Sequence, residues 1–319
     1  MVGGGITGLA TAWFLRDRAR VTLIEADDRL GGKIRTASLG GVPVEEGPDT
    51  FLARVPHARA LAEAVGLGDA LVEPATGTAF IWTRGRLRPL PEGQVLGVPV
   101  ELGPLVRSGV LAPGAVARAG LDLVLPRSRS GLSADPSVAD VIGARMGQGV
   151  VDRLVEPLVG GINAGRADDL SLAATAPQLA AASSSSRSLV LGLRKRRRTA
   201  AAAAAGVAAG PLFLGVAGGL GRLVERLVAS LSDAGVEIRT GVSVTSIEPD
   251  SRGTRVVTSS AGSLAAAAVV VTVPAFAAAP LVRGTAPAVA TDLERIRYAS
   301  VAVSTLAYLP ADVASPLDG

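Results

Sequence analysis

The stretch that decides the fold is MVGGGITGLATAWFLRDRARVTLIE, residues 1–25. Its glycines have the GxGxxG spacing, and an apolar helical face from Leu9 to Leu15 follows them. The short β-branched run Val21–Ile24 comes next and ends at Glu25. A glycine turn, a helix and a buried strand in this order predict a dinucleotide-binding α/β fold. Because only two residues precede the glycines, we expect the natural first strand to begin earlier.

Each glycine of this turn has a distinct predicted task. Gly3 permits the tight turn, Gly5 lets the backbone approach a pyrophosphate, and Gly8 permits close packing of helix on strand. Glu25 is expected to bind the ribose hydroxyls, and its charge disfavours a 2′-phosphate, so FAD or NAD fits better than NADP. A glycine turn with an incidental acidic residue is the alternative. The predicted cofactor-binding residues of this unit are Gly3, Gly4, Gly5, Ile6, Thr7, Gly8, Glu25 and Ala26.

Composition removes several other kinds of chemistry. The chain of 319 residues has no cysteine and a single histidine, so thiolate sites, disulfides and Ser/His/Asp triads lack raw material. We therefore expect no metal site and a bound cofactor that supplies the reactivity. His57 follows Pro56 at a predicted helix start, where a capping or surface role is favoured over catalysis. Lys and Arg total 32 against 28 Asp and Glu, and only Arg194–Arg198 is strongly basic, which argues against nucleic acid as a partner.

Two uncharged stretches bear on the relation to membranes. Residues 199–221 and 262–282 reach membrane-spanning length, but both are rich in alanine and glycine and contain proline. Buried strand plus loop is the favoured interpretation of both. Because the N-terminal residues also show no signal-peptide pattern, we predict a cytoplasmic protein.

Periodicity predicts alternating helices and strands along the rest of the chain. Residues 55–71 are helical in pattern, 80–90 predict a hairpin that turns at Gly85, and 96–180 predict mainly helices broken at prolines. A serine run, the basic run and an alanine tract indicate that residues 181–211 form a mobile surface connection with little to bury. The expected helix breakers are Pro104, Pro113, Pro126, Pro136 and Pro157. An amphipathic helix is predicted at 223–231, and strands are predicted at 236–238, 242–247, 255–258, 269–273 and 300–308.

The residues after the first unit separate flavin from nicotinamide. The segment EADDRLGGKIRT, residues 25–36, resembles the FAD-binding signature shared by monoamine oxidases, phytoene desaturases and protoporphyrinogen oxidases. In that signature a second glycine pair, here Gly31 and Gly32, passes beside the flavin, and Arg29 offers a forked donor to phosphate or to neighbouring carbonyls. The stretch EGPDTF, residues 46–51, resembles the next segment, which lies against the flavin; an ordinary surface turn is the alternative.

The resemblance extends the predicted cofactor site to one further strand. Val244 matches the residue whose backbone meets the adenine, although a plain strand valine explains it equally well. The cofactor-binding residues that the resemblance adds are Arg29, Gly32, Lys33, Gly47, Pro48, Asp49, Thr50 and Val244.

A second motif narrows the resemblance to porphyrinogen oxidases. EPLVGGINAG at residues 156–165, followed by DDLS at 168–171, resembles a run found in protoporphyrinogen and coproporphyrinogen oxidases. Gly161 matches a glycine that lies close to the flavin and the substrate. The resemblance implies oxidation of a porphyrinogen to the porphyrin in haem biosynthesis, with FAD as cofactor, O₂ as electron acceptor and H₂O₂ as second product. The form of the motif favours coproporphyrinogen III, with protoporphyrinogen IX next.

No catalytic base is required by this chemistry, and we assign none. The arginines considered as partners for the substrate carboxylates are Arg54, Arg84, Arg86 and Arg88, for which solvated surface is the favoured interpretation.

The resemblance also implies a discontinuous domain organisation. Residues 1–74 and 212–284 are expected to form a Rossmann-like FAD-binding domain. Residues 96–180 would form a mainly helical insertion, which in some relatives rests on a membrane surface. Peripheral membrane contact assisted by Arg194–Arg198 is therefore one interpretation for this chain, and a solvated loop explains that run equally well. Residues 75–95, 181–211 and 285–319 are assigned to an incomplete α+β substrate domain. Because family members continue past the last residue, we expect both ends to be missing and FAD to bind weakly or not at all.

Two other functions stay open on the sequence. A flavin oxidase of the same fold that acts on an amine or a carotenoid precursor fits the N-terminal motifs but not the run at 156–165. A catalytically inactive flavoprotein fragment fits the expected truncation. The oligomeric state is not fixed by any of these patterns.

Overall fold

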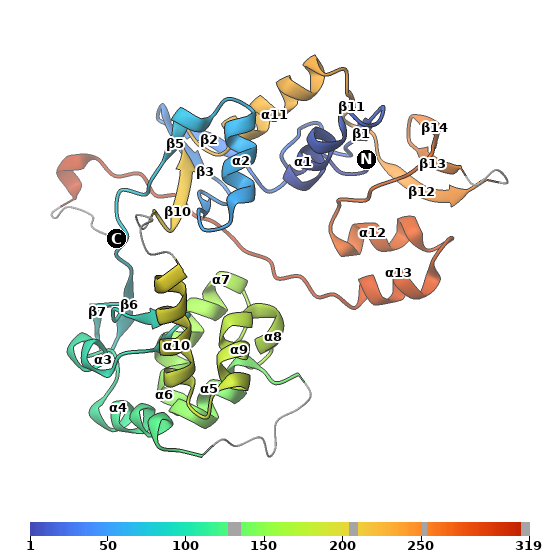
Figure 1. Cartoon of the computed structure of the whole chain (residues 1–319). Coiled ribbons are helices and arrows are strands. Elements are labelled where there is room, and N and C mark those ends of the chain that lie inside the picture. The colour runs from blue at the N-terminus through green and yellow to red at the C-terminus, as the bar shows by residue number, and fades with distance from the viewer. Residues whose placement is uncertain (127–134, 204–209, 251–253, 314–319) are drawn as a thin grey trace. The chain divides into compact units, whose positions relative to one another are not determined.

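The computed structural model describes residues 1–126, 135–203, 210–250 and 254–313. The chain divides into two compact units, which are coloured along the sequence in Figure 1. The first unit comprises Met1–Ala75, Gly210–Tyr298 and Ala302–Val313, and the second comprises the described parts of Thr76–Ala209 with Ala299–Val301. Helices and strands occur together, so the predicted α/β class is confirmed, whereas the assignment of cofactor and substrate domains stays a prediction.

The first unit is built around a small parallel layer. Strand β1 (Thr22–Ile24) pairs in parallel with β11 (Glu237–Arg239). On the other edge of β1, Val2 forms parallel bridges to Ile24 and to Val271. The prediction of a five-residue strand at 269–273 is therefore wrong. The hydrogen bonds from this segment to Val2 form a single bridge, at Val271.

Helices α1 (Ile6–Leu15) and α11 (Gly221–Asp233) pack on each other beside this layer (Figure 1). Leu9 of α1 and Leu227 and Leu231 of α11 are fully buried in the same apolar cluster as Leu23 of β1. Burial of one such side chain stabilises the fold by about 1.5–3 kcal/mol. The amphipathic pattern thus predicted α11 correctly, including its end before Gly235, which has φ +76°.

The remaining elements of the first unit form two further sheets and a hairpin. The hairpin is β2 (Thr36–Leu39) with β3 (Val42–Glu45), and β10 (Phe213–Val216) lies between β4 (Phe51–Leu52) and β5 (Leu71–Val72). An antiparallel sheet contains β12 (Val244–Pro249), β13 (Arg255–Ser259) and β14 (Gly262–Ala266). The helices are α2 (Pro56–Ala64), η1 (Gly68–Ala70), α12 (Ala275–Val282), α13 (Pro287–Glu294) and η4 (Pro310–Asp312). Strand β14 was not predicted, because glycine and alanine carry little of the β-branched signal.

The second unit begins with two hairpins and continues as helices. The hairpins are β6 (Phe80–Thr83) with β7 (Arg86–Pro89), as predicted, and β8 (Gln94–Val95) with β9 (Val98–Pro99). The helices up to the motif are α3 (Leu102–Ser108), α4 (Pro113–Gly120), η2 (Leu121–Leu123), α5 (Val138–Met146) and α6 (Gln148–Val150). They continue with η3 (Val151–Gly160), which is a π-helix, α7 (Gly161–Asn163), α8 (Leu172–Thr175), α9 (Pro177–Ser185) and α10 (Leu189–Ala203).

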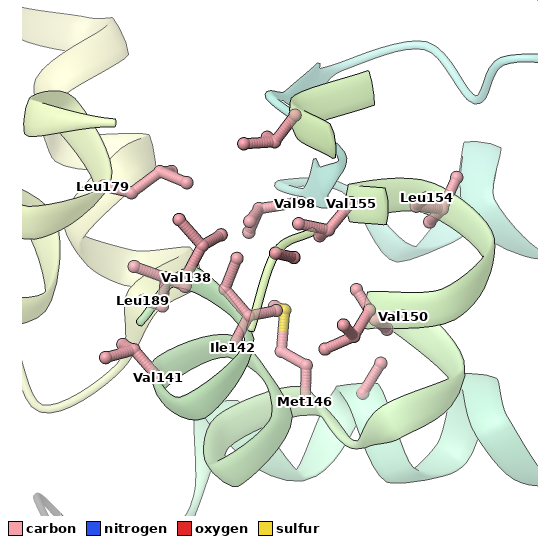
Figure 2. Packing of buried hydrophobic residues seen from close by; sticks show 14 of the residues in the cluster. Val98, Val138, Val141, Ile142, Met146, Val150, Leu154, Val155, Leu179 and Leu189 are labelled. Carbon is pink, nitrogen blue, oxygen red and sulfur yellow. The ribbon is translucent and has the colours of Figure 1, made fainter. Parts of the chain in front are cut away.

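The core of the second unit is a single apolar cluster. Figure 2 shows side chains from α5, η3, α9 and α10 converging in it. Its largest fully buried members are Leu105, Ile142, Met146, Leu154, Leu179 and Leu189. The helices of this unit therefore owe their stability to shared burial rather than to their individual propensities.

A buried ion pair ties α10 to this core. The Asp122 carboxylate is fully buried and accepts hydrogen bonds from Arg145 Nε (2.7 Å) and Ser188 Oγ (2.6 Å). It also accepts the backbone N–H groups of Leu189 and Val190, at 3.2 and 3.0 Å. The anion thus caps the first turn of α10, where the helix dipole favours negative charge.

The prediction that residues 181–211 form a mobile surface connection is wrong for the part of this segment that the structure describes. Helices α9 and α10 occupy most of it, and Leu189, Val190 and Leu193 are buried. The short apolar face of α10 is masked in the sequence by the basic run, and alanine is itself a strong helix former. Residues 204–209 of the alanine tract lie outside the described residues.

Two other local predictions also differ from the structure. Pro104 lies inside the first turn of α3, where its missing N–H breaks no helical bond, and Pro157 lies inside the π-helix η3. Residues 299–309, predicted to contain a strand, have no strand assigned and are exposed. Their β-branched and apolar side chains gave a strand signal, but a strand also needs a hydrogen-bonded neighbour.

In the parts of the chain that the structure describes, no helix combines the length and the apolar character that crossing a membrane requires. The stretch 262–282, interpreted as strand plus loop, contains β14 and also the helix α12.

Candidate functional site

The predicted glycine turn lies at the start of α1. Gly5 is the N-cap residue and has an extended backbone, with φ −68° and ψ 176°. Because glycine has no side chain to cap the helix, the N–H groups of the first turn, which contains Ile6 and Thr7, face the space in front of it. The positive end of the helix dipole also lies here, so the turn suits an anionic group.

Gly3 and Gly8 are required by packing. A Cβ at Gly8 would lie 1.9 Å from the carbonyl oxygen of Gly3, which is far inside van der Waals contact. Gly3 has φ +106°, a conformation that side-chain-bearing residues rarely adopt. The tight turn and the close helix packing therefore both depend on glycine, as the spacing predicted.

Gly5 is different, because the space beside it is open. A Cβ at Gly5 would meet only the Cα of Gly32, at 3.9 Å. Gly31 forms a parallel bridge to Gly5, and its N–H donates to the Gly4 carbonyl at 2.9 Å. The structure thus brings the two glycine pairs together, backbone against backbone.

The Glu25 carboxylate lies against the same turn. It accepts the Gly4 N–H at 2.5 Å and the Asp27 N–H at 2.9 Å. Ala26, which lies between Glu25 and Asp27 in the sequence, is exposed. Each carboxylate oxygen has two lone pairs, so acceptor capacity remains for sugar hydroxyls. The contact with Gly4 was not predicted, since a backbone donor leaves no mark in the sequence.

The next predicted residues continue from this turn. Arg29 donates to the Gly32 carbonyl at 2.7 Å, so its guanidinium binds its own loop, one of the two options that the sequence left open. The Lys33 ammonium lies 5.8 Å from the centre of the Tyr298 ring. A Cβ at Gly47 would lie 2.1 Å from the Lys33 carbonyl oxygen, so close packing explains glycine at this position.

A cavity of about 230 Å³ opens beyond Gly47 within the first unit. Asp49 and Thr50 line it together with Glu45, Gly215 and Gly219, whereas exposed Pro48 is not among the lining residues. Val244 lies at the start of β12, two residues after Val242, whose N–H donates to the Glu25 carbonyl at 2.9 Å. Contacts thus link Gly5 to Gly32 and Lys33 to Gly47, and Asp49 and Thr50 line the cavity, whereas Pro48 and Val244 are not among its lining residues.

Gly161 belongs to the second unit. It lies at the end of the π-helix η3, is exposed, and has open space where a Cβ would be. Two bonds fix the turn after it, from Asn163 Nδ2 to the Val159 carbonyl at 2.7 Å and from the Ala167 N–H to Glu156 at 2.9 Å. Gly161 is thus presented on a well-defined turn.

The arginines of the β6–β7 hairpin have local partners. Arg84 donates to the Gly109 and Leu111 carbonyls, and Arg88 to that of Ser108, at the C-terminal end of α3. Burial lowers the pKa of Arg88, and the neighbouring charges of Arg86 and Arg84 lower it further. Arg88 therefore caps the last carbonyl of α3, and Arg84 binds carbonyls of residues just after that helix.

Comparison with known proteins places this arrangement in a family. The model of the flavin containing amine oxidoreductase family matches residues 6–311. The chain belongs to this family. Coproporphyrinogen III oxidase of Propionibacterium freudenreichii subsp. freudenreichii is 41% identical, over 97% of this chain and 63% of that protein. The enzyme of the same name from Mycobacterium bovis is 35% identical, over 99% of this chain and 67% of that protein.

Solved structures of the family agree with the fold. The crystal structure of a candidate protoporphyrinogen oxidase from Exiguobacterium sp. 255-15 has a TM-score of 0.76 at 34% identity, over 92% of this chain and 62% of that one. Putrescine oxidase gives a TM-score of 0.58 at 17% identity, a likeness of fold alone. The family resemblance seen in the motifs is confirmed, and the chain spans about two thirds of the length of these porphyrinogen oxidase relatives.

Proposed function

We propose that this member of the flavin oxidoreductase family is an FAD-dependent oxidase that converts a porphyrinogen, preferably coproporphyrinogen III, to the porphyrin. The observation that carries the proposal is the 35–41% identity, over 97–99% of this chain, to relatives named coproporphyrinogen III oxidase. The run at 156–165 supports it, because that run resembles the porphyrinogen oxidases specifically. We place protoporphyrinogen IX second.

The first unit fits an FAD. Gly5 leaves room for a pyrophosphate in front of the α1 N-terminus, since the nearest atom to its missing Cβ is 3.9 Å away. Glu25 stands at the same turn with acceptor capacity for the ribose. Gly47 packs on the Lys33 carbonyl, and the cavity beside Asp49 and Thr50 supports a flavin end there. We propose that the cofactor-binding residues predicted from the sequence contact the FAD in this unit.

The proposed reaction is a repeated two-electron oxidation. When bound, a flavin accepts a hydride equivalent from the substrate and is reoxidised by O₂. Over three cycles a porphyrinogen loses six hydrogen atoms and becomes the aromatic porphyrin, while three O₂ molecules become three H₂O₂. The protein would bind and orient the macrocycle, and the exposed turn at Gly161 is the proposed contact with it.

A turnover assay tests the proposal. The chain is incubated with FAD and, under air, with coproporphyrinogen III, protoporphyrinogen IX or putrescine, while porphyrin fluorescence and H₂O₂ are recorded. We expect porphyrin formation above the protein-free oxidation rate, fastest with coproporphyrinogen III, and about three H₂O₂ per porphyrin. Peroxide from the amine alone would favour an amine oxidase, and FAD binding without any turnover would favour an inactive flavoprotein.

A further inference from the structure

We propose that Glu45 is a positioning residue of the flavin site, acting with Thr36 to hold the wall of the cavity in place. Glu45 lies outside the motifs quoted above, and Thr36 is the last residue of the segment at 25–36, where no role was assigned to it. The inference rests on the proposed function, because it assigns the cavity to the flavin end of FAD.

The Glu45 carboxylate joins three segments of the first unit. One of its oxygens accepts the Leu220 N–H at 2.5 Å, and the other accepts the Thr36 hydroxyl at 2.8 Å. The Thr36 hydroxyl oxygen in turn accepts the Gly221 N–H at 2.9 Å. The hairpin β2–β3 thereby binds two consecutive N–H groups at the start of α11, which the helix itself leaves without partners. The negative charge also complements the helix dipole.

Steric contacts fix the glycines of the same turn. Gly218 and Gly219 have φ +82° and +101°. A Cβ at Gly219 would lie 2.4 Å from Thr36 Cγ2, so the turn rests directly on the threonine. The turn is thus held both by hydrogen bonds and by close contact with Thr36.

This turn forms part of the cavity wall. Gly219 and Glu45 both line the cavity, together with Asp49 and Thr50. The stretch that contains Asp49 and Thr50 is joined to the glycine cradle, because Gly47 packs on the Lys33 carbonyl and the Glu46 N–H donates to the Arg35 carbonyl at 2.8 Å. Removal of the Glu45 carboxylate frees the Leu220 N–H and lets the turn relax. We therefore expect the shape of the cavity, and not only the stability of the unit, to depend on Glu45.

Four variants test this assignment by FAD binding instead of turnover. Glu45→Ala removes both bonds, Glu45→Gln keeps one acceptor, Thr36→Val removes the hydroxyl, and Thr36→Ser keeps it. Glu63→Gln is the matched control, because Glu63 lies on α2 and its carboxylate pairs with exposed Arg59 at 2.9 Å. The readouts are the Kd for FAD, the visible circular dichroism of bound flavin, and the Tm without and with FAD.

We expect Glu45→Ala to raise the Kd for FAD by about tenfold, because the relaxed turn changes the shape of the cavity, and to change the visible dichroism. Glu45→Gln and Thr36→Val should fall between this variant and the wild type, and Thr36→Ser and Glu63→Gln should match the wild type.

Two results would overturn the assignment while leaving the proposed function intact. In the first, Glu45→Ala leaves the Kd for FAD, the dichroism and the Tm all unchanged. In the second, its Tm without FAD falls while both flavin readouts stay constant, which marks a purely structural residue. If the wild type itself binds no FAD, the proposed function fails and the assignment fails with it.

Discussion

At the scale of single residues, glycines of one motif are needed for different reasons. A side chain at Gly8 would collide with the Gly3 carbonyl at 1.9 Å, whereas Gly5 has open space beside it. The spacing in the sequence predicted both positions, since the tight turn and the helix start dictate them. It did not predict the Glu45–Thr36 pair, because such contacts join residues far apart in the chain and follow no repeat.

Alanine at these two positions should separate folding from binding. Gly8→Ala must displace backbone, and we expect it to destabilise the first unit by about 1–3 kcal/mol in urea unfolding. Gly5→Ala makes only an ordinary contact at 3.9 Å, so its unfolding should change by less than about 1 kcal/mol while FAD affinity falls at least about tenfold. Unchanged FAD affinity in a folded Gly5→Ala protein would contradict the role given to the cradle.

At the scale of helices and strands, prediction succeeded where one periodic pattern matched one buried face. The apolar face of α11 and the hairpin β6–β7 are examples. It failed where structure depends on a partner. The start of α10 is capped by Asp122, which is distant in the sequence. Residues 269–273 were predicted as a strand, but they form a bridge to Val2 and not a longer pairing. A pattern in one segment carries no information about whether its neighbour exists.

The buried carboxylate at α10 gives a test at this scale. Asp122→Ala leaves Arg145 without its partner and removes the cap of α10, so we expect a loss of about 3–5 kcal/mol in the stability of the second unit. Glu101→Ala is the control, because Glu101 forms an exposed pair with Arg197 at 3.2 Å worth about 0–1 kcal/mol. Urea unfolding followed by circular dichroism compares the two. Equal losses of stability in the two variants would show that Asp122 does not stabilise the second unit through its buried contacts.

At the scale of the whole molecule, the two resemblances lie in different parts of the sequence. The glycine motifs of the first unit resemble a signature that several kinds of flavin oxidase share. The run at 156–165 in the second unit narrows the resemblance to porphyrinogen oxidases. The partners of the substrate carboxylates could not be predicted, because arginine is abundant on the surface and its local roles, such as capping α3, look the same in sequence.

Titration of the chain with FAD, followed by flavin fluorescence and by Tm, tests the central claim most directly. Because Glu25 and the Gly31–Gly32 pair both contact the glycine turn, we expect FAD to bind weakly but saturably, with one FAD per chain and a Kd in the micromolar range or above. ADP should compete, and stability should rise by about 2.7 kcal/mol when FAD is present at about 100 times the Kd. A folded chain whose Tm and fluorescence do not respond to FAD up to millimolar concentration would contradict it.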